Sequence, residues 1–475
     1  MRFWRARTLM YLNARSVGLH DHTLMKGFET LKAYGLFDRN VPRYTSYPTA
    51  THFKAQVEPD RQARWLQQLQ PRQSISLYVH IPFCRRVCWF CACRTQGLAG
   101  DSRLNRYLDG LHREIAWVAD RLPPGVTVSR LHLGGGTPTL LSPDQLSALV
   151  GAIQHRFEFD HRIEFSVEID PNEIDSERLT VLSHAGMNRA SVGVQDFDPR
   201  VQQAIGRSQS YEITAQVVSQ LRAHDIQSLN VDMLYGLPYQ TEARLVRSIE
   251  LLHALAPDRV ALYGYAHVPW MAKRQILIPT DALPSTEARF YLAERAHSQW
   301  TSQGYEAIGI DHFARPDDGL ARAKHQGLLR RNFQGYTDDT APTLIGLGAS
   351  AISKYPQGFI QNDPDTAGYL ARIETGQGAG TRGHVFRGED GTRARAIEML
   401  LCDFAIDFHQ LEAVDADGAA QCRQIASHVA SNFGKAVSLS EEALAIPPAM
   451  RPLTRLIAQW FDGYEVASSA HSSAI

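Results

Sequence analysis

The sequence predicts an α/β protein whose largest part is a partial barrel of six parallel βα units. Short apolar runs rich in β-branched residues alternate with helical patterns over residues 75–270. These runs lie 25–55 residues apart, which leaves room for a crossover helix between parallel strands. Polar residues gather where the runs end, as they do on the catalytic rim of βα barrels. The sequence therefore predicts a functional site at that rim.

Six strands are expected in the barrel, each a short apolar run. They are Ser76–His80, Arg130–Gly134, Glu164–Ile169, Ala190–Gln195, Leu229–Leu234 and Arg259–Tyr265. The first two strands enclose a helix whose apolar residues recur at helical spacing from Leu104 to Val118. We expect Asp101 or Ser102 to cap its first turn.

Residues that favour the first or last turn of a helix mark where the other helices begin and end. Ser142 with Pro143 opens the second, because proline suits the first helical turn. Gly186 is expected to end the third helix, and Thr241 to begin the fourth. Beyond a break rich in glycine and threonine at residues 375–392, a helical stripe indicates a mostly helical C-terminal region. This stripe consists of Ile397, Leu400, Leu401 and Phe404.

Length and composition limit the classes of function. The chain has 475 residues, enough for about two to four domains or one large barrel with appendages. Its 49 Lys and Arg residues balance 50 Asp and Glu residues, which argues against a chain that coats nucleic acid or an anionic membrane. No stretch reaches the ~18 apolar residues of a membrane span. We therefore expect neither nucleic acid nor a membrane as a partner.

The two ends of the chain differ from the rest. Residues 1–20 carry four arginines and no acid, as transit peptides do, but they lack a long apolar core. We expect residues 1–30 to be an extension, either disordered or the product of a start assigned too early, with Met25 as an alternative start. The tail Ala467–Ile475 is small and polar, and we expect it to be disordered.

Four of the six cysteines fall within ten residues, in the pattern Cys-x3-Cys-x2-Cys-x-Cys. They are Cys84, Cys88, Cys91 and Cys93. This density indicates a metal or cluster site in a reducing compartment. A structural zinc site would usually need a second, separated pair of ligands, and none follows. Three close thiolates after a strand suit a 4Fe–4S cluster with one open iron, the iron that chelates S-adenosylmethionine (SAM) in radical SAM enzymes. The role of Cys93 stays open, because it is too close to Cys91 for an obvious fourth ligand.

Glycines and acids follow the next strands. Gly134, Gly135 and Gly136 let the backbone approach a ligand closely, which suits the methionyl end of SAM, although a glycine triplet can also be only a tight turn. Glu168 and Asp232 can accept hydrogen bonds from a ribose or an ammonium group. Their alternative roles are helix caps or surface ion pairs. A buried strand gains nothing from such acids, so their place at strand ends favours a site.

With these residues in view, the chain closely resembles the oxygen-independent coproporphyrinogen III dehydrogenases of haem synthesis, from about Tyr34 to Phe461. Its shared motifs, besides the four cysteines, are Pro42–Thr49, Glu168–Pro171, Gly193–Phe197, Asp232–Pro238, Tyr265–His267, Asp311–Pro316 and Asn332–Thr337. Leu133 departs from the family, in which an aromatic residue is common before the glycine triplet.

The resemblance implies a radical SAM barrel over residues 76–355, preceded by a strap at 31–75 and followed by a helical C-terminal domain at 356–475. It also implies cofactor sites by position. The cluster ligands are Cys84, Cys88 and Cys91. The cluster-bound SAM matches Tyr78, Gly135, Glu168 and Ile352. A second SAM matches Phe90, Gly136, Thr137, Gln195, Arg207, Asp232 and Ala266.

The implied reaction converts two of the four propionates of coproporphyrinogen III to vinyl groups. A primary carbon radical from SAM can remove the strong β C–H hydrogen, and two propionates are consistent with two SAM molecules. The carboxylates need cationic partners, and the candidates are Arg43, Arg315, Arg330 and Arg331. A reducing donor of the flavodoxin or ferredoxin type, an electron acceptor, a monomeric state and a cytoplasmic location are also expected.

Three alternatives remain at this point. A haem-binding chaperone paralogue would typically lack Cys93 and the strap residues Arg43–Thr49, and the same features disfavour a porphyrin-ring-opening methyltransferase. A zinc-stabilised barrel acting as a binding module would contain no iron or sulfide. A dinucleotide oxidoreductase is excluded, because Gly134–Gly136 is not part of a Gly-x-Gly-x-x-Gly motif.

Overall fold

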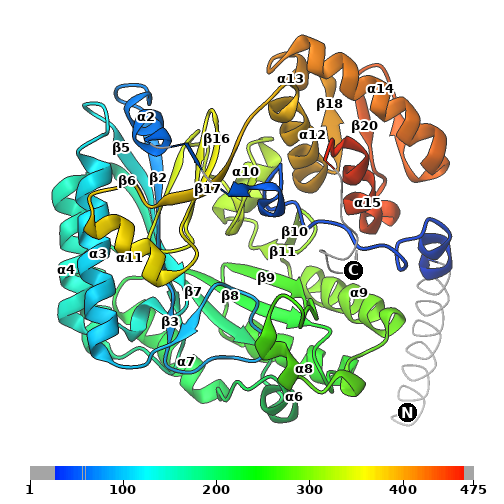
Figure 1. Cartoon of the computed structure of the whole chain (residues 1–475). Coiled ribbons are helices and arrows are strands. Elements are labelled where there is room, and N and C mark those ends of the chain that lie inside the picture. Colours follow the sequence, from blue (N-terminus) through cyan, green and yellow to red (C-terminus); the bar gives the residue numbers. More distant parts are fainter. Residues whose placement is uncertain (1–26, 56, 59, 465–475) are drawn as a thin grey trace, which may run out of the picture.

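The computed structural model describes residues 27–55, 57–58 and 60–464 (Figure 1). Residues 1–26 of the expected extension and the tail Ala467–Ile475 lie outside this range. The described chain forms a large curved sheet flanked by helices and a smaller C-terminal part beside it, at the upper right of Figure 1. Within the described residues, no helix is both long enough and apolar enough to cross a membrane.

All six expected barrel strands form and pair in parallel. They are β2 (Ser74–Ile81), β5 (Thr127–Gly135), β6 (Glu158–Ile169), β7 (Arg189–Gln195), β8 (Ser228–Tyr235) and β9 (Arg259–Gly264). β6 begins six residues earlier than expected. Its first half is polar and largely exposed, so apolar patterning does not reveal it. A seventh parallel strand, β14 (Leu344–Leu347), pairs with β2 and was not predicted.

Antiparallel strands extend the sheet at both edges, and the strand order of the described chain is linear, which confirms the partial barrel. On the β14 side lie β15 (Ile352–Tyr355), β16 (Gly358–Asn362), β17 (Gly380–Val385) and β1 (Lys54–Ala55), and on the β9 side β11 (His312–Ala314) and β10 (Glu306–Ile308). A domain boundary at residue 355 would separate the hydrogen-bonded strands β15 and β16. The main sheet therefore ends only at Val385.

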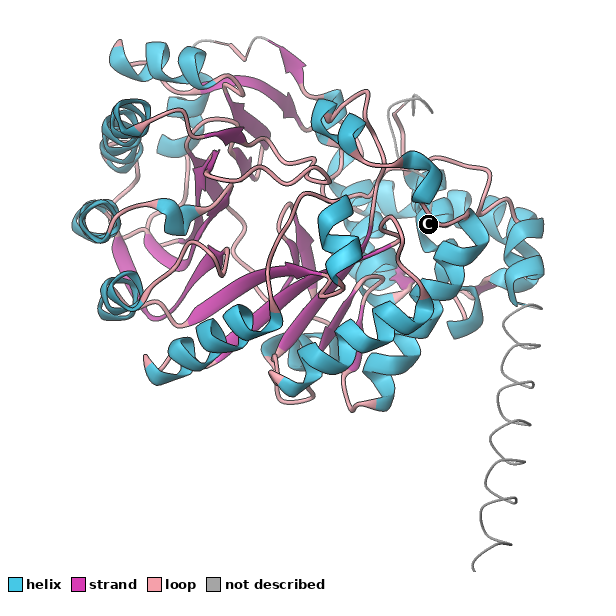
Figure 2. Cartoon of the chain, turned by 90° about the horizontal axis from the view of Figure 1, so that it is seen from below, coloured by secondary structure: helices cyan, strands magenta, loops and turns pink. Residues whose placement is uncertain are grey.

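Helices cover the convex face of the sheet (Figure 2). They are α3 (Asp101–Ala119), α4 (Pro143–Arg156), α5 (Ser176–His184), α6 (Pro199–Ala204), α7 (Tyr211–Ala223), α8 (Glu242–Ala254), α9 (Thr286–Ser302) and α11 (Thr366–Glu374). Ser142 forms a capping box and Thr241 caps α8, both as predicted. The expected cap of α3 is wrong, because Gly100 is the N-cap and Asp101 lies in the first turn. There the carboxylate stabilises the positive end of the helix dipole.

The C-terminal part has its own core. It contains α12 (Asp390–Asp403), α13 (Phe408–Glu412), α14 (Ala416–Phe433), α15 (Thr454–Ala458) and a small sheet of β18 (Ala405–Asp407), β20 (Ala443–Ala445) and β19 (Ser438–Leu439). Strap residues Val41, Tyr44 and Tyr47 are buried in this core, whereas β1 pairs with β17. The strap thus connects the C-terminal part to the edge of the main sheet.

Several shorter elements lie between these strands and helices. They are α2 (Arg61–Gln67), α10 (Gly319–His325), the parallel pair β3 (Phe83–Cys84) and β4 (Gln96–Gly97), and the hairpin of β12 (Arg330–Asn332) and β13 (Gly335–Thr337). The short 3-10 helix η3 (Lys273–Leu277) follows β9.

Candidate active site

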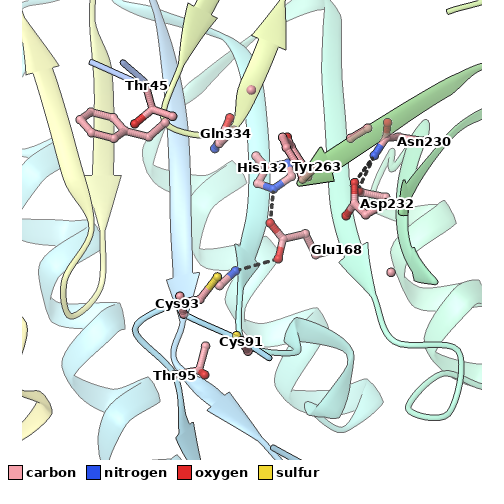
Figure 3. Close-up of a pocket in the computed structure, with 18 of the residues that line it drawn as sticks. Thr45, Cys91, Cys93, Thr95, His132, Glu168, Asn230, Asp232, Tyr263 and Gln334 are labelled. Carbon is pink, nitrogen blue, oxygen red and sulfur yellow. Dashed lines mark hydrogen bonds and ion pairs between the residues drawn. The ribbon is translucent and has the colours of Figure 1, made fainter. Parts of the chain in front are cut away.

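A cavity of about 780 Å³ lies on the inner side of the curved sheet (Figure 3). It extends from the cysteine loop to the strap and the β12–β13 hairpin. Every cofactor-site residue expected from the sequence lines it. These are Tyr78, Cys84, Cys88, Phe90, Cys91, Gly135, Gly136, Thr137, Glu168, Gln195, Arg207, Asp232, Ala266 and Ile352. They come from segments far apart in the sequence, so the fold brings the expected set together.

The cysteines follow β2 directly. Cys84 is buried on β3, and the loop from β3 to β4 carries Cys88, Cys91 and Cys93, which is exposed. Arg207 donates a hydrogen bond to Cys88 Sγ at 3.4 Å. This contact places a fixed positive charge beside one of the thiols.

These thiols fit a 4Fe–4S cluster. Hydrogen bonds to sulfur tune such clusters, and Arg207 supplies one. Among the described side chains, no three of His, Cys, Asp or Glu stand close enough together to hold one metal ion. A 4Fe–4S cluster does not need three ligands on one ion, because each thiolate binds a different iron. Cys84, Cys88 and Cys91, beside an open cavity, would hold three irons of such a cluster and would leave the fourth free for a ligand.

The glycine loop is locked against the cysteine-bearing segment. The Gly136 N–H donates to Ile81 O at 2.7 Å, and the Thr137 N–H donates to Phe83 O at 2.9 Å. A Cβ at Gly136 would lie 2.3 Å from Phe83 O, and Gly135 has a φ of +111°. Only glycine fits these two positions, so the loop backbone itself faces the cavity.

Glu168 is fixed beside this loop (Figure 3). Its carboxylate accepts from the Gly135 N–H at 3.0 Å and contacts His132 Nε2 at 3.2 Å. Burial favours the neutral acid, but the bonds from His132 and Gly135 outweigh it, so the pKa of Glu168 lies below its usual value. The Tyr78 ring stacks on His132 with centroids 5.7 Å apart. Sequence reasoning missed His132, although its period-two spacing from Gly134 was the available signal.

Asp232 also lines the cavity, two strands along the sheet from Glu168. It accepts from Asn230 Nδ2 at 2.9 Å and from Ser191 at 3.4 Å. Burial, aided by the negative charge of Glu168, raises the pKa of Asp232 to about 6. One acid is therefore held ionised, while the other can gain or lose a proton near neutral pH.

The residues expected around the second SAM are held by polar contacts. Gln275, fully buried in η3, donates to Phe90 O at 2.8 Å and to Ala266 O at 3.1 Å. Arg207 donates to Gly193 O at 2.7 Å, next to the irregular end of β7, where Gln195 has a φ of +72°. Gln275 was not predicted, because no periodic pattern marks a residue in an irregular segment.

Two of the four candidate arginines line the cavity. Arg43, on the strap, donates to Gly264 O at 2.7 Å and makes no ion pair among the described residues. Arg331 is buried and paired with Asp311 at 3.2 Å, so its charge is already balanced. Arg43 is therefore the candidate most able to receive a substrate carboxylate.

The other two candidates lie elsewhere. β11 runs antiparallel to β9, and this direction places Arg315 at the opposite end of the barrel. There the Arg315 N–H donates to Asp258 O, and its side chain contacts Asp317. Arg330 precedes Arg331 on a strand, so its side chain points to the opposite face, toward Glu398. The expectation that Arg315 and Arg330 bind substrate carboxylates in the cavity is therefore wrong, because neither side chain lines it.

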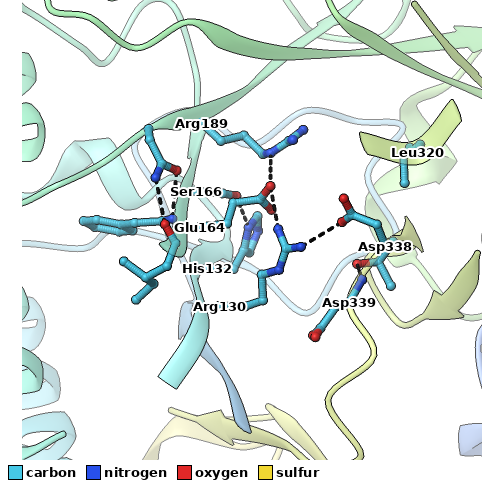
Figure 4. Close-up of polar contacts among 12 residues, drawn as sticks. Arg130, His132, Glu164, Ser166, Arg189, Leu320, Asp338 and Asp339 are labelled. Carbon is cyan, nitrogen blue, oxygen red and sulfur yellow. Dashed lines mark hydrogen bonds and ion pairs between the residues drawn. The ribbon is translucent and has the colours of Figure 1, made fainter. Parts of the chain in front are cut away.

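A network of charged side chains on β5, β6 and β7 reaches the cavity through Glu164 and Arg189, which line it (Figure 4). Arg130 contacts Glu164 at 2.6 Å and Asp338 at 2.9 Å, and Arg189 contacts Glu164 at 2.9 Å. Burial opposes ionisation of Glu164, but Arg189 and Arg130 lower its pKa to about 2. The ion pairs of Glu164 with Arg130 and Arg189 join β5, β6 and β7.

The sheet and the site are those of a radical SAM protein, and the family model described as the radical SAM superfamily matches residues 78–252. An oxygen-independent coproporphyrinogen III oxidase from Paracoccus denitrificans is 53% identical over 445 residues, covering 94% of this chain and 99% of that protein. The protein of the same name from Salmonella typhimurium is 37% identical, covering 90% and 94%. The chain belongs to the family of oxygen-independent coproporphyrinogen III oxidases.

A solved structure agrees with this family. Coproporphyrinogen III oxidase from Escherichia coli, described as a radical SAM enzyme, matches with a TM-score of 0.84 and 35% sequence identity. The match covers 89% of this chain and 98% of that structure. The strap, the barrel and the C-terminal part thus have counterparts in a known enzyme.

Proposed function

We propose that this protein converts coproporphyrinogen III to protoporphyrinogen IX without oxygen, by oxidative decarboxylation of two propionates to vinyl groups. The observation that carries the proposal is the single cavity lined by all fourteen expected cofactor-site residues. Family membership supports the substrate, since the relatives are named for it.

The cysteines Cys84, Cys88 and Cys91 hold a 4Fe–4S cluster in this proposal. When bound, the cluster and SAM supply the electron and the 5′-deoxyadenosyl radical that takes a hydrogen from the propionate β carbon. Tyr78, Gly135, Glu168 and Ile352 bind the cluster-bound SAM. The second SAM lies against Phe90, Gly136, Thr137, Gln195, Arg207, Asp232 and Ala266.

The protein residues position and protect the reactants. The ionised Glu168 accepts from donors of SAM, because its charge is maintained at neutral pH. Arg43 of the strap binds a propionate in the cavity, beside the carboxyl end of β9. The strap and the curved sheet enclose this space and keep water from a reactive radical.

The proposal also covers the oligomeric state, the location and the redox partners of the enzyme. It acts as a monomer in the cytoplasm, where thiols stay reduced. A donor of the flavodoxin or ferredoxin type reduces the cluster, and a further acceptor takes the final electron. The even overall charge and the full-length barrel allow a monomer.

The test is an anaerobic turnover assay. The cluster is reconstituted, and SAM, a reductant, an electron acceptor and coproporphyrinogen III are added. We expect protoporphyrinogen IX with two 5′-deoxyadenosines and two CO2 per turnover. SAM cleavage without a vinyl product would refute the substrate and favour a haem-binding paralogue. Failure to bind iron and sulfide would refute the cluster.

A further inference from the structure

Four large apolar side chains stand exposed on one short segment after β9. Trp270, Met271, Ile276 and Leu277 are 60%, 61%, 73% and 57% exposed, and we call them the 270–277 patch. Single exposed apolar residues are ordinary, but a cluster of this kind marks an interaction site. Tryptophan and methionine are enriched at protein interfaces.

The inner side of this segment holds the cysteine loop. Gln275 donates to Phe90 O, and Arg274 donates to the Thr95 hydroxyl at 2.9 Å and to Thr95 O at 2.6 Å. The segment thus binds the cysteine loop at two points, before and after Cys91. A protein that docks on the 270–277 patch comes to rest directly beside the predicted cluster ligands.

The surroundings of the patch are basic. The three segments that meet there, residues 84–97, 200–208 and 266–278, contain seven Lys and Arg residues and no Asp or Glu, in a chain with a net charge of −1. Lys273 among them is exposed within the patch itself, whereas Arg86 and Arg94 are exposed where they line the cavity. Lys273 therefore places a positive charge within an apolar surface, and complementary charge steers the encounter with an acidic partner.

We propose that the 270–277 patch and Lys273 form the docking surface for an acidic protein that delivers one electron to the cysteine-bound cluster. This proposal rests on the proposed function, which requires reduction of the cluster. One electron leaves the carrier, which is oxidised, and enters the cluster, which is reduced, and no bond forms or breaks. The position of the patch against the cysteine loop gives this electron a short path.

The test measures binding of the full-length, cluster-reconstituted protein to two probes, a bacterial flavodoxin and a plant-type [2Fe–2S] ferredoxin, by anaerobic biolayer interferometry. We expect the Trp270→Ser/Ile276→Ser variant and the Lys273→Glu variant each to weaken the Kd of the bound probe about tenfold or more. Raising the salt concentration weakens the wild type but affects Lys273→Glu less. The matched controls, Val414→Ser/Leu439→Ser and Lys435→Glu, change exposed residues on the C-terminal part and keep the wild-type Kd.

A chemical reductant separates this proposal from the proposed function. With dithionite, all variants cleave SAM at the wild-type rate, while the two patch variants lose carrier-driven cleavage. Patch variants that bind both probes as the wild type does would overturn the docking surface, as would a wild type that binds neither probe. Patch-dependent binding to anionic vesicles or patch-dependent dimerisation would also overturn it. A wild type that fails to cleave SAM with dithionite refutes the proposed function, and the binding comparison still decides the patch.

Discussion

Replacing Gly136 by alanine tests whether the glycine loop is locked onto the cysteine-bearing segment. A Cβ at this position would lie 2.3 Å from Phe83 O and 2.9 Å from Ile81 O, and both neighbours are backbone atoms that cannot rotate away. Ordinary contact begins at 3.4 Å, so the loop has to move by about 1 Å. The movement opposes two hydrogen bonds, from Gly136 to Ile81 O and from Thr137 to Phe83 O.

The size of the effect follows from those bonds. A backbone hydrogen bond contributes ~1 kcal/mol to stability, so losing both costs about 2 kcal/mol. For a unit of about 300 residues this lowers the Tm by about 3 °C. Misplacement of a binding group by about 1 Å lowers activity on the order of a hundredfold. We therefore expect a small loss of stability and a large loss of SAM cleavage.

Thermal unfolding by circular dichroism and anaerobic SAM cleavage measure the two effects. The matched control is Gly151→Ala in the interior of α4, where the new Cβ meets nothing within 4 Å. It is expected to keep full activity and to gain up to about 1 kcal/mol of stability. A Gly136→Ala protein with wild-type Tm and wild-type SAM cleavage would refute the steric argument.

Three further predictions concern the metal site, the substrate and pH. Cys84→Ala lowers the iron and sulfide content of the reconstituted protein well below that of the wild type, whereas Cys93→Ser keeps it; equal contents in both variants would contradict this. Arg43→Gln raises the KM for coproporphyrinogen III about tenfold or more, because a charge-assisted hydrogen bond contributes ~1.5–3 kcal/mol, and Arg315→Gln leaves the KM unchanged in the same assay. Burial raises the pKa of Glu114 from 4.5 to about 7. The folded state therefore binds this proton more tightly than the unfolded state. About 3 kcal/mol of stability is lost as the pH rises from 4.5 to about 7. Glu114→Gln should remove this decline in a pH series of melting curves, and an unchanged decline would assign it to other groups.

The barrel strands could be predicted because buried apolar residues recur along each of them, on the face that helices cover. The missed parts carry no such signal. β14 has only four residues, and the first half of β6 is exposed and charged. Edge strands such as β1 are defined by their partners rather than by their own composition.

Some parts of the candidate site could likewise be predicted from the sequence, and others could not. The cysteine spacing and the glycine triplet are local, so the sequence alone identifies them. The roles of the arginines depend on which face of a strand they occupy and on the direction of that strand. Arg331 and Arg330 are neighbours in sequence, yet only Arg331 faces the cavity. Arg315 lies within a motif shared with the family, but the antiparallel course of β11 removes it from the site.

The alternation of residues along the inner strands explains how one sheet can be both stable and reactive. Residues that face the helices are apolar and buried, and they include Leu131, Leu133, Val167, Val192, Val231 and Met233. Their neighbours along the same strands line the cavity and are polar, and they include His132, Ser166, Glu168, Ser191, Asn230 and Asp232. Because burial of apolar surface supplies most of the stability, the helix-facing residues hold the sheet together without help from the inner face. The inner face is thereby free to carry acids, histidine and glycine for binding, and the sheet has no need to close around a packed interior.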